Sequence, residues 1–169
     1  MMRNLEAKFR IGDAVVARAR AEAIGFSLRA TLVQRDTFFA VAHGKLKLRE
    51  EVDSAALIHY RRVHQDLLEV SDYEIVPVAD PGPLHTMLAG ALGVLAEIRK
   101  VRTLLMRRNV RLHLDRVEGL GCFGEIEAVM AAGAPPAVYR AEVEGILAAL
   151  EIVPDNLIGK SYFELVHRG

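Results

Sequence analysis

Residues 111–127 read RLHLDRVEGLGCFGEIE, which is typical of two short strands joined at a glycine-containing turn. The first strand alternates leucines with polar side chains, and its polar face carries Arg111, His113 and Asp115. The second strand alternates in the same way and puts two glutamates on one face. A charged strand face usually meets water, while the apolar face covers the core. The charged face of this hairpin is so rich in chemically useful groups that it indicates a functional surface.

Length and composition predict one domain that spans residues 1–169, because 51% hydrophobic residues suffice for a sizeable core. Lysine plus arginine equals aspartate plus glutamate at 22 each, so bulk charge gives no reason to expect a nucleic acid or a membrane surface as partner. The sequence shows no apolar run of signal-peptide or membrane-span length. The single cysteine, Cys122, cannot form an internal disulfide, which suits a reducing compartment. We therefore expect a cytoplasmic protein.

Alternation of apolar and polar residues predicts further strands on both sides of the opening hairpin. They span residues 3–11, 27–41, 45–49, 57–63, 72–78 and 94–107. Helices are expected within residues 14–24, 84–92 and 131–150, with a short closing helix near the C-terminus. Residues 64–70 are expected to form a turn region. Most connections are too short for parallel crossovers, so the sheet should be mostly antiparallel.

The charged faces of these strands carry eight cations and four carboxylates, and the opposite faces are mostly apolar. The cations are Lys8, Lys45, Lys47, Arg49, Arg62, Lys100, Arg102 and Arg111. The carboxylates are Glu6, Asp115, Glu125 and Glu127. Three cations on one short strand, residues 45–49, would repel one another unless an anion lay in front of them.

Two architectures satisfy this pattern. In one, a sheet packs its apolar face on helices and turns its charged face to water. In the other, the sheet closes into a barrel whose lumen holds the charged side chains. Buried like charges are costly without partners, so the barrel requires a ligand. A polyphosphate with Mg²⁺ or Mn²⁺ fits, because cations bind phosphate oxygens and carboxylates bind the metal. The agreement across separate strands favours this second architecture.

At this point the ordered motifs resemble a known family, the CYTH superfamily of triphosphate tunnel metalloenzymes, which includes class IV adenylyl cyclases and thiamine triphosphatases. The resembling segments are residues 4–8, 34–39, 44–49, 57–62, 100–102, 113–121 and 125–127. The resemblance covers nearly the whole chain and implies a single CYTH-like domain. Its fold would be α+β, an eight-stranded antiparallel closed β-barrel (a triphosphate tunnel) with helices packed outside.

The resemblance also implies a role for each charged lumen residue. Glu6, Glu125 and Glu127 would bind the divalent metal, and Asp115 would help with the metal or orient a neighbouring cation. The phosphates would be held by Lys8, Lys45, Lys47, Arg49, Arg62, Lys100, Arg102 and Arg111. Of these, Lys8, Lys47 and Arg49 are the predicted catalytic residues.

Two positions of the implied site stand apart. Asn4 lies where the family has the first glutamate of its ExExK signature, which removes a negative charge. We therefore expect weaker metal binding, or one metal where relatives hold two. His113 is either a member of the site or a structural hydrogen-bonding residue.

The functional prediction is a metal-dependent enzyme whose partner is a nucleoside triphosphate or polyphosphate. A class IV adenylyl cyclase-like reaction, ATP to cyclic AMP and pyrophosphate, ranks first. Hydrolysis of tripolyphosphate or of an organic triphosphate, as in thiamine triphosphatase, ranks next. A non-catalytic binder of polyphosphate or nucleotide, and a helix-backed sheet without a phosphate site, remain as alternatives. The sequence leaves a homodimer open.

Overall fold

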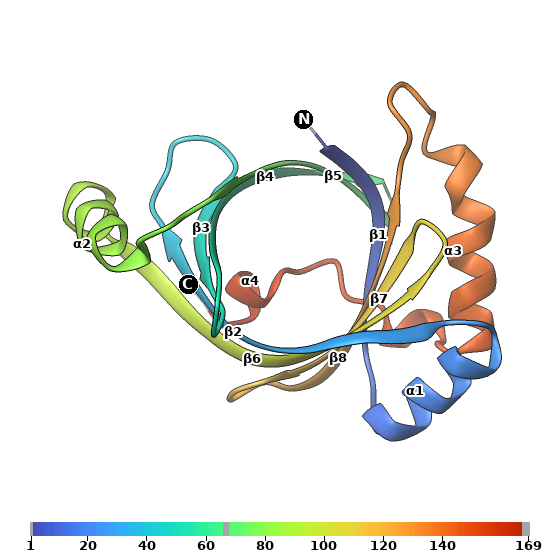
Figure 1. Cartoon of the computed structure of the whole chain (residues 1–169). Helices are drawn as coiled ribbons and strands as arrows, with labels where there is room; N and C mark the ends of the chain where they lie inside the picture. Colours follow the sequence, from blue (N-terminus) through green and yellow to red (C-terminus); the bar gives the residue numbers. More distant parts are fainter. Residues whose placement is uncertain (1, 66–67, 167–169) are drawn as a thin grey trace.

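A closed β-barrel forms the body of the protein in the computed structural model, which describes residues 2–65 and 68–166 (Figure 1). Within these residues, eight antiparallel strands close in the order β1-β5-β4-β3-β2-β6-β7-β8. The strands are β1 (Met2–Arg10), β2 (Ser27–Phe39), β3 (Lys45–Glu50), β4 (Ala55–Gln65), β5 (Leu68–Pro77), β6 (Val94–Arg107), β7 (Val110–Val117) and β8 (Gly121–Val129). The predicted eight-stranded antiparallel barrel is thus confirmed.

Helices flank the barrel on two sides, and a short one lies across its bore in the view of Figure 1. They are α1 (Ala14–Ala23), α2 (Pro81–Leu92), α3 (Ala137–Ala149), the 3₁₀ turn η1 (Pro154–Asn156) and α4 (Tyr162–Val166). The Asp13 carboxylate caps α1 by accepting from the backbone amides of Val15 and Val16 at 2.7 and 3.3 Å. Among the described helices, none is long and apolar enough to cross a membrane.

Strand alternation separates an outer core from the lumen. On β1, Leu5, Ala7 and Phe9 are almost fully buried in a cluster that includes Val143 and Ile146 of α3. Burial of a large apolar side chain contributes about 1.5–3 kcal/mol, so this seam fixes which face of β1 points outward. The alternate β1 side chains, which carry the charges, consequently enter the barrel.

Gly124 shows how tightly this outer layer packs. Gly124 pairs with Phe9 across the β1–β8 ladder, and a Cβ atom at Gly124 would overlap the Phe9 ring. A larger residue would therefore push β1 away from β8, the strand that completes the barrel.

The expected turn region at residues 64–70 is wrong where the structure describes it. Strand β4 continues to Gln65 and β5 already begins at Leu68, while residues 66–67 lie outside the described residues. The polar residue Glu69 concealed the strand in the sequence. In the barrel its carboxylate lies 3.1 Å from the guanidinium of Arg62, so a charged side chain is accommodated inside β5.

Candidate active site

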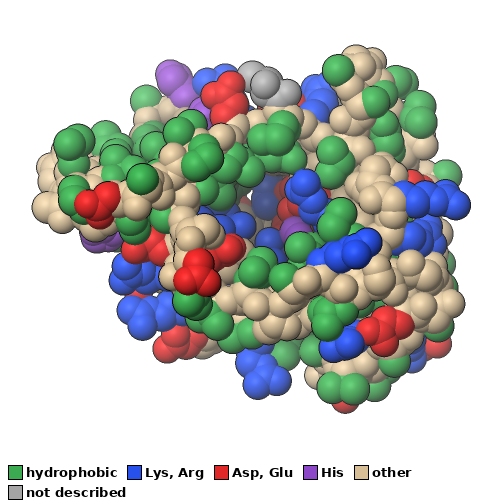
Figure 2. All heavy atoms as spheres, viewed as in Figure 1, with side chains coloured by type: hydrophobic (Ala, Val, Ile, Leu, Met, Phe, Trp, Pro, Cys, Tyr) green, Lys and Arg blue, Asp and Glu red, His purple; other side chains and the backbone are tan. Residues whose placement is uncertain are grey.

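The lumen of the barrel is a cavity of about 490 Å³, and Figure 2 shows its mouth with basic, acidic and histidine side chains inside. Most of the predicted site residues line it. They are Glu6, Lys8, Lys47, Arg49, Arg62, Lys100, Arg102, Arg111, Glu125 and Glu127. The other two, Lys45 and Asp115, lie beside the cavity and are described below. Strand closure thus brings together residues that are up to 121 positions apart in sequence, Glu6 and Glu127.

An acidic group occupies the side of the lumen formed by β1, β7 and β8. The register sets Glu6 opposite Glu127 and His113 opposite Glu125. Ligand atoms of His113, Glu125 and Glu127 lie within 4.8 Å of one another. Carboxylate and imidazole groups that converge in this way can hold a divalent metal ion.

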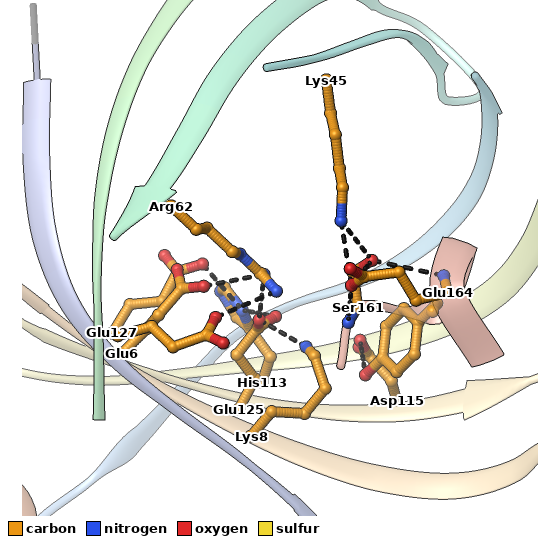
Figure 3. Close-up of polar contacts among 12 residues, drawn as sticks. Glu6, Lys8, Lys45, Arg62, His113, Asp115, Glu125, Glu127, Ser161 and Glu164 are labelled. Carbon is orange, nitrogen blue, oxygen red and sulfur yellow. Dashed lines mark hydrogen bonds and ion pairs between the residues drawn. The ribbon is translucent and has the colours of Figure 1, made fainter. Parts of the chain in front are cut away.

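Cations from four strands surround this acidic group, and Figure 3 shows two of them, Lys8 and Arg62. Lys8 Nζ lies 2.5 Å from Glu125 Oε1, and a guanidinium nitrogen of Arg102 lies 3.1 Å from Glu125 Oε2. Arg62 lies 2.7 Å from Glu6. Arg111 approaches Glu127 at 3.6 Å. These pairs balance the buried carboxylates in the absence of any ligand, and they put cations within reach of a phosphate bound beside the acids.

A second cluster of cations, on β3 and β6, converges on Asp36 of β2. Lys47 and Lys100 lie 3.1 and 2.9 Å from Asp36 Oδ2, and Arg49 binds both carboxylate oxygens at 2.7 Å. Sequence reasoning assigned Asp36 no role. Its position on the same strand face as the lumen residue Gln34 was the signal that could have identified it.

Burial and charge shift the pKa values of this cluster strongly. Burial alone would raise the pKa of Asp36, but Arg49, Lys100 and Lys47 together hold it well below its usual range. Burial, together with neighbouring cations such as Arg49, lowers the pKa of Lys100 to about 7 and that of Lys47 to about 8. Asp36 thus stays ionised at neutral pH, whereas the two lysines have pKa values close to neutral pH.

Asp115 lies behind Arg102. Its two oxygens accept hydrogen bonds from the Arg102 guanidinium at 2.7 and 2.6 Å, and the Tyr162 hydroxyl donates to it at 2.8 Å. Burial would raise the pKa of Asp115, but Arg102 outweighs burial and keeps this pKa below its usual value. This geometry fits the orienting role expected for Asp115, whereas its role as a metal ligand stays a prediction.

Lys45 is held at the rim by the C-terminal segment (Figure 3). Its ammonium group donates to Ser161 Oγ at 2.9 Å and lies 2.9 Å from a Glu164 carboxylate oxygen. Tyr162, from the same segment, lines the lumen, and Lys8 lies 4.2 Å from its ring centroid. The sequence predicted only a short closing helix here, with no contribution to the site.

The donor set suits a hard divalent cation. Burial and the neighbouring Glu125 and Glu127 raise the pKa of Glu6 to about 8, although Arg62 opposes them. Such mutual repulsion is relieved by a cation. Asn4 Oδ1 is also buried at the lumen and has no hydrogen-bond partner among the described residues. Carboxylate and amide oxygens of this kind are ligands that Mg²⁺ and Mn²⁺ accept.

Comparisons with known proteins agree with this geometry. The CYTH domain family model matches residues 2–162. A candidate adenylate cyclase of Methanocaldococcus jannaschii is 28% identical over 174 residues, which cover 97% of this chain and 98% of that protein.

Solved structures share the barrel at lower identity. A protein of Pyrococcus horikoshii superposes with a TM-score of 0.87 at 21% identity, covering 96% of this chain and 98% of that one. A candidate adenylyl cyclase of Hippeastrum, whose structural description states a dominant triphosphatase activity, has a TM-score of 0.66 at 19% identity and covers 96% and 94%. At these identities the likeness shows the fold alone.

Proposed function

Because the chain belongs to the CYTH domain family, whose members act on triphosphates as cyclases or triphosphatases, we propose that it is a class IV adenylyl cyclase-like enzyme. It would convert ATP to cyclic AMP and pyrophosphate. The observation that carries the proposal is the lumen itself, in which a cation cluster on β3 and β6, held by Asp36 of β2, faces an acidic group on β1 and β8. The adenylate cyclase name of the Methanocaldococcus jannaschii relative supports this reaction over the others.

The cluster around Asp36 supplies the phosphate-binding charges. Lys47, Arg49 and Lys100 are fixed by one buried carboxylate before any substrate arrives. Preorganised charges in a confined site stabilise developing negative charge with little reorganisation, and this is their advantage over water. Arg102, oriented by Asp115, extends the same surface towards Glu125.

The acidic group would hold Mg²⁺ or Mn²⁺ through Glu6, Glu125 and Glu127. When bound, the ion neutralises charge on the phosphates. Lys8 is then placed to leave Glu125 and donate to a phosphate oxygen, because its 2.5 Å contact with that carboxylate points its ammonium group into the lumen.

In the cyclase reaction the ribose 3′-hydroxyl would give its proton to water and form a bond to the α-phosphorus, while the bond from that phosphorus to the leaving pyrophosphate oxygen breaks. The pyrophosphate gains negative charge as it leaves. Lys47 and Arg49, with Lys8, would stabilise that charge through hydrogen bonds from their cationic groups.

Hydrolysis is the second candidate, favoured by the triphosphatase activity stated for the Hippeastrum relative. A water molecule would then attack the terminal phosphorus of tripolyphosphate or of an organic triphosphate and release orthophosphate. The same lumen cations would serve both reactions.

Product analysis tests the proposal. The protein is incubated with ATP, tripolyphosphate or thiamine triphosphate plus Mg²⁺ or Mn²⁺, and products are followed by phosphorus NMR. Cyclic AMP with pyrophosphate is the expected result, and orthophosphate would assign hydrolysis instead. Binding without turnover of any substrate would overturn the enzyme proposal in favour of a polyphosphate-binding protein.

Matched variants locate the activity in the lumen. Lys47→Ala and Glu127→Ala should abolish turnover, whereas the exposed Lys160→Ala and Glu118→Ala should retain it. Equal activity in all four variants would place the reaction outside the barrel.

A further inference from the structure

His113 on β7 has an unusual position for a buried histidine. Its side chain is 6% exposed, and its Nδ1 atom has no hydrogen-bond partner among the described residues. That nitrogen lies 3.6 Å from Glu125 Oε2 and 3.7 Å from Glu127 Oε1. The ring therefore presents a polar atom to two carboxylates without bonding to either.

These separations suit a shared ion better than a direct hydrogen bond. A hydrogen bond between nitrogen and oxygen spans about 2.7–3.2 Å, so both contacts are too long. Two ligand atoms about 2.1 Å from one octahedral ion stand about 3.0 Å apart in neighbouring positions and about 4.2 Å apart in opposite positions. The observed separations of 3.6 and 3.7 Å lie between these two values, and all three ligand atoms lie within 4.8 Å of one another.

We propose that His113 is a metal ligand through Nδ1, beside Glu125 and Glu127, and that this nitrogen makes the centre prefer Mn²⁺ to Mg²⁺. Mg²⁺ takes oxygen ligands, whereas Mn²⁺ accepts carboxylate oxygens and, as a first-row transition ion, also binds an imidazole nitrogen more readily than Mg²⁺ does. The inference takes from the proposed triphosphate function only that the lumen binds a metal ion. It adds which ion the site prefers.

Charge balance supports a neutral third ligand. Two carboxylates and a neutral imidazole carry a charge of minus two, which a divalent ion cancels once Lys8, Arg102 and Arg111 turn from Glu125 and Glu127 to the phosphates. Asn4, at the position where the family has an acid, adds an oxygen donor without adding charge. The charge of Glu6, the third acid of the proposed metal site, is balanced by Arg62 at 2.7 Å. The amide of Asn4 is a weaker metal ligand than the glutamate that the family has at this position, and His113 would supply the missing ligand.

Pulsed electron paramagnetic resonance of Mn²⁺ bound to the substrate-free protein tests the proposal directly. A coordinated imidazole nitrogen modulates the electron spin echo, and we expect this modulation in the native protein. His113→Gln should lose the modulation and bind Mn²⁺ at least ~10-fold more weakly. Its Mg²⁺ affinity should change by a smaller factor, because the glutamine carbonyl oxygen can replace the nitrogen.

His43→Gln is the matched control, since His43 is an exposed histidine in the β2–β3 turn. It should keep both the modulation and the metal preference. Bound Mn²⁺ without nitrogen modulation, or an unchanged ratio of Mn²⁺ to Mg²⁺ affinity in His113→Gln, would overturn the assignment of His113. That result would leave the triphosphate function intact, because turnover is measured separately. Absence of turnover with nitrogen-coordinated Mn²⁺ would overturn the proposed function alone.

Discussion

Asp36 holds three cations of the lumen with one carboxylate. Lys47, Arg49 and Lys100 all lie within 3.1 Å of its oxygens, and Asp36 is 2% exposed. Buried cations without a counter-charge are strongly unfavourable. The free energy of folding and the geometry of the phosphate-binding surface therefore depend on the same residue.

Asp36→Asn should destabilise the fold and increase its dependence on anions. Loss of the buried charge should lower the free energy of unfolding by about 3 kcal/mol, because the cations lose their partner. Tripolyphosphate supplies negative charge, so it should stabilise the variant more than the native protein. Urea unfolding with and without tripolyphosphate measures both effects, with the exposed Asp53→Asn as control. Equal stabilisation of variant and native protein would show that Asp36 does not organise the anion site.

Sequence alternation could place most of these side chains but not their partners. The faces of β1, β3 and β6 follow directly from period-two patterns, so Lys8, Lys47 and Lys100 were assigned to one surface. Asp36 lies in a run of aromatic and β-branched residues, and its partners come from β3 and β6. Contacts at that separation depend on barrel closure, which no local pattern encodes.

The C-terminal segment is the element whose role the sequence concealed. Residues 161–164 lie against the rim of the barrel, where Glu164 holds Lys45 at 2.9 Å. Burial would raise the pKa of Glu164, but Ser161 and Lys45 lower it to about 2. The segment thus keeps a negative charge at the mouth through which a polyanion would approach.

Glu164→Gln should strengthen tripolyphosphate binding. The native carboxylate competes with phosphate for Lys45. Because the Lys45–Glu164 pair is partly exposed, it contributes about 0.2–1 kcal/mol. Without this competition the Kd for tripolyphosphate should be roughly 1.4–5-fold lower. Isothermal titration calorimetry at low salt measures this change. Glu144→Gln, on the outer helix α3, is the control with equal change in net charge. Weaker binding by Glu164→Gln would show that this carboxylate assists the ligand instead.

At the scale of the whole molecule, zero net charge conceals a segregation of charge by position. The chain carries 22 basic and 22 acidic residues, yet barrel closure turns a dense set of both signs inward. Alternating apolar and charged faces predicted the strands and favoured a barrel over an open sheet, whereas the eight-stranded closed fold was implied by the resemblance to the CYTH family. The depth of the lumen could not be predicted, because β4 and β5 extend further than the alternating patterns of residues 57–63 and 72–78 indicate.

This inward charge should make polyanion binding depend on pH. In the free protein the pKa of Lys100 is about 7 and that of Lys47 about 8. A bound polyphosphate stabilises the ammonium form and raises both pKa values. Binding at pH 8 should then take up protons, and affinity should fall as pH rises from 7 to 9. For each proton that binding takes up, the affinity falls by up to about tenfold for every unit by which the pH rises.

Calorimetry in two buffers of different ionisation enthalpy counts these protons, with chelator present to remove divalent ions. The double variant Lys47→Arg/Lys100→Arg keeps both charges throughout this pH range, so it should take up fewer protons than the native protein at pH 8. The ligand's own protonation contributes equally to both proteins and cancels in the difference. Equal proton uptake would mean that both lysines stay charged in the free lumen. Burial would then be offset fully by Asp36, and the phosphate-binding surface would carry its whole charge before any ligand arrives.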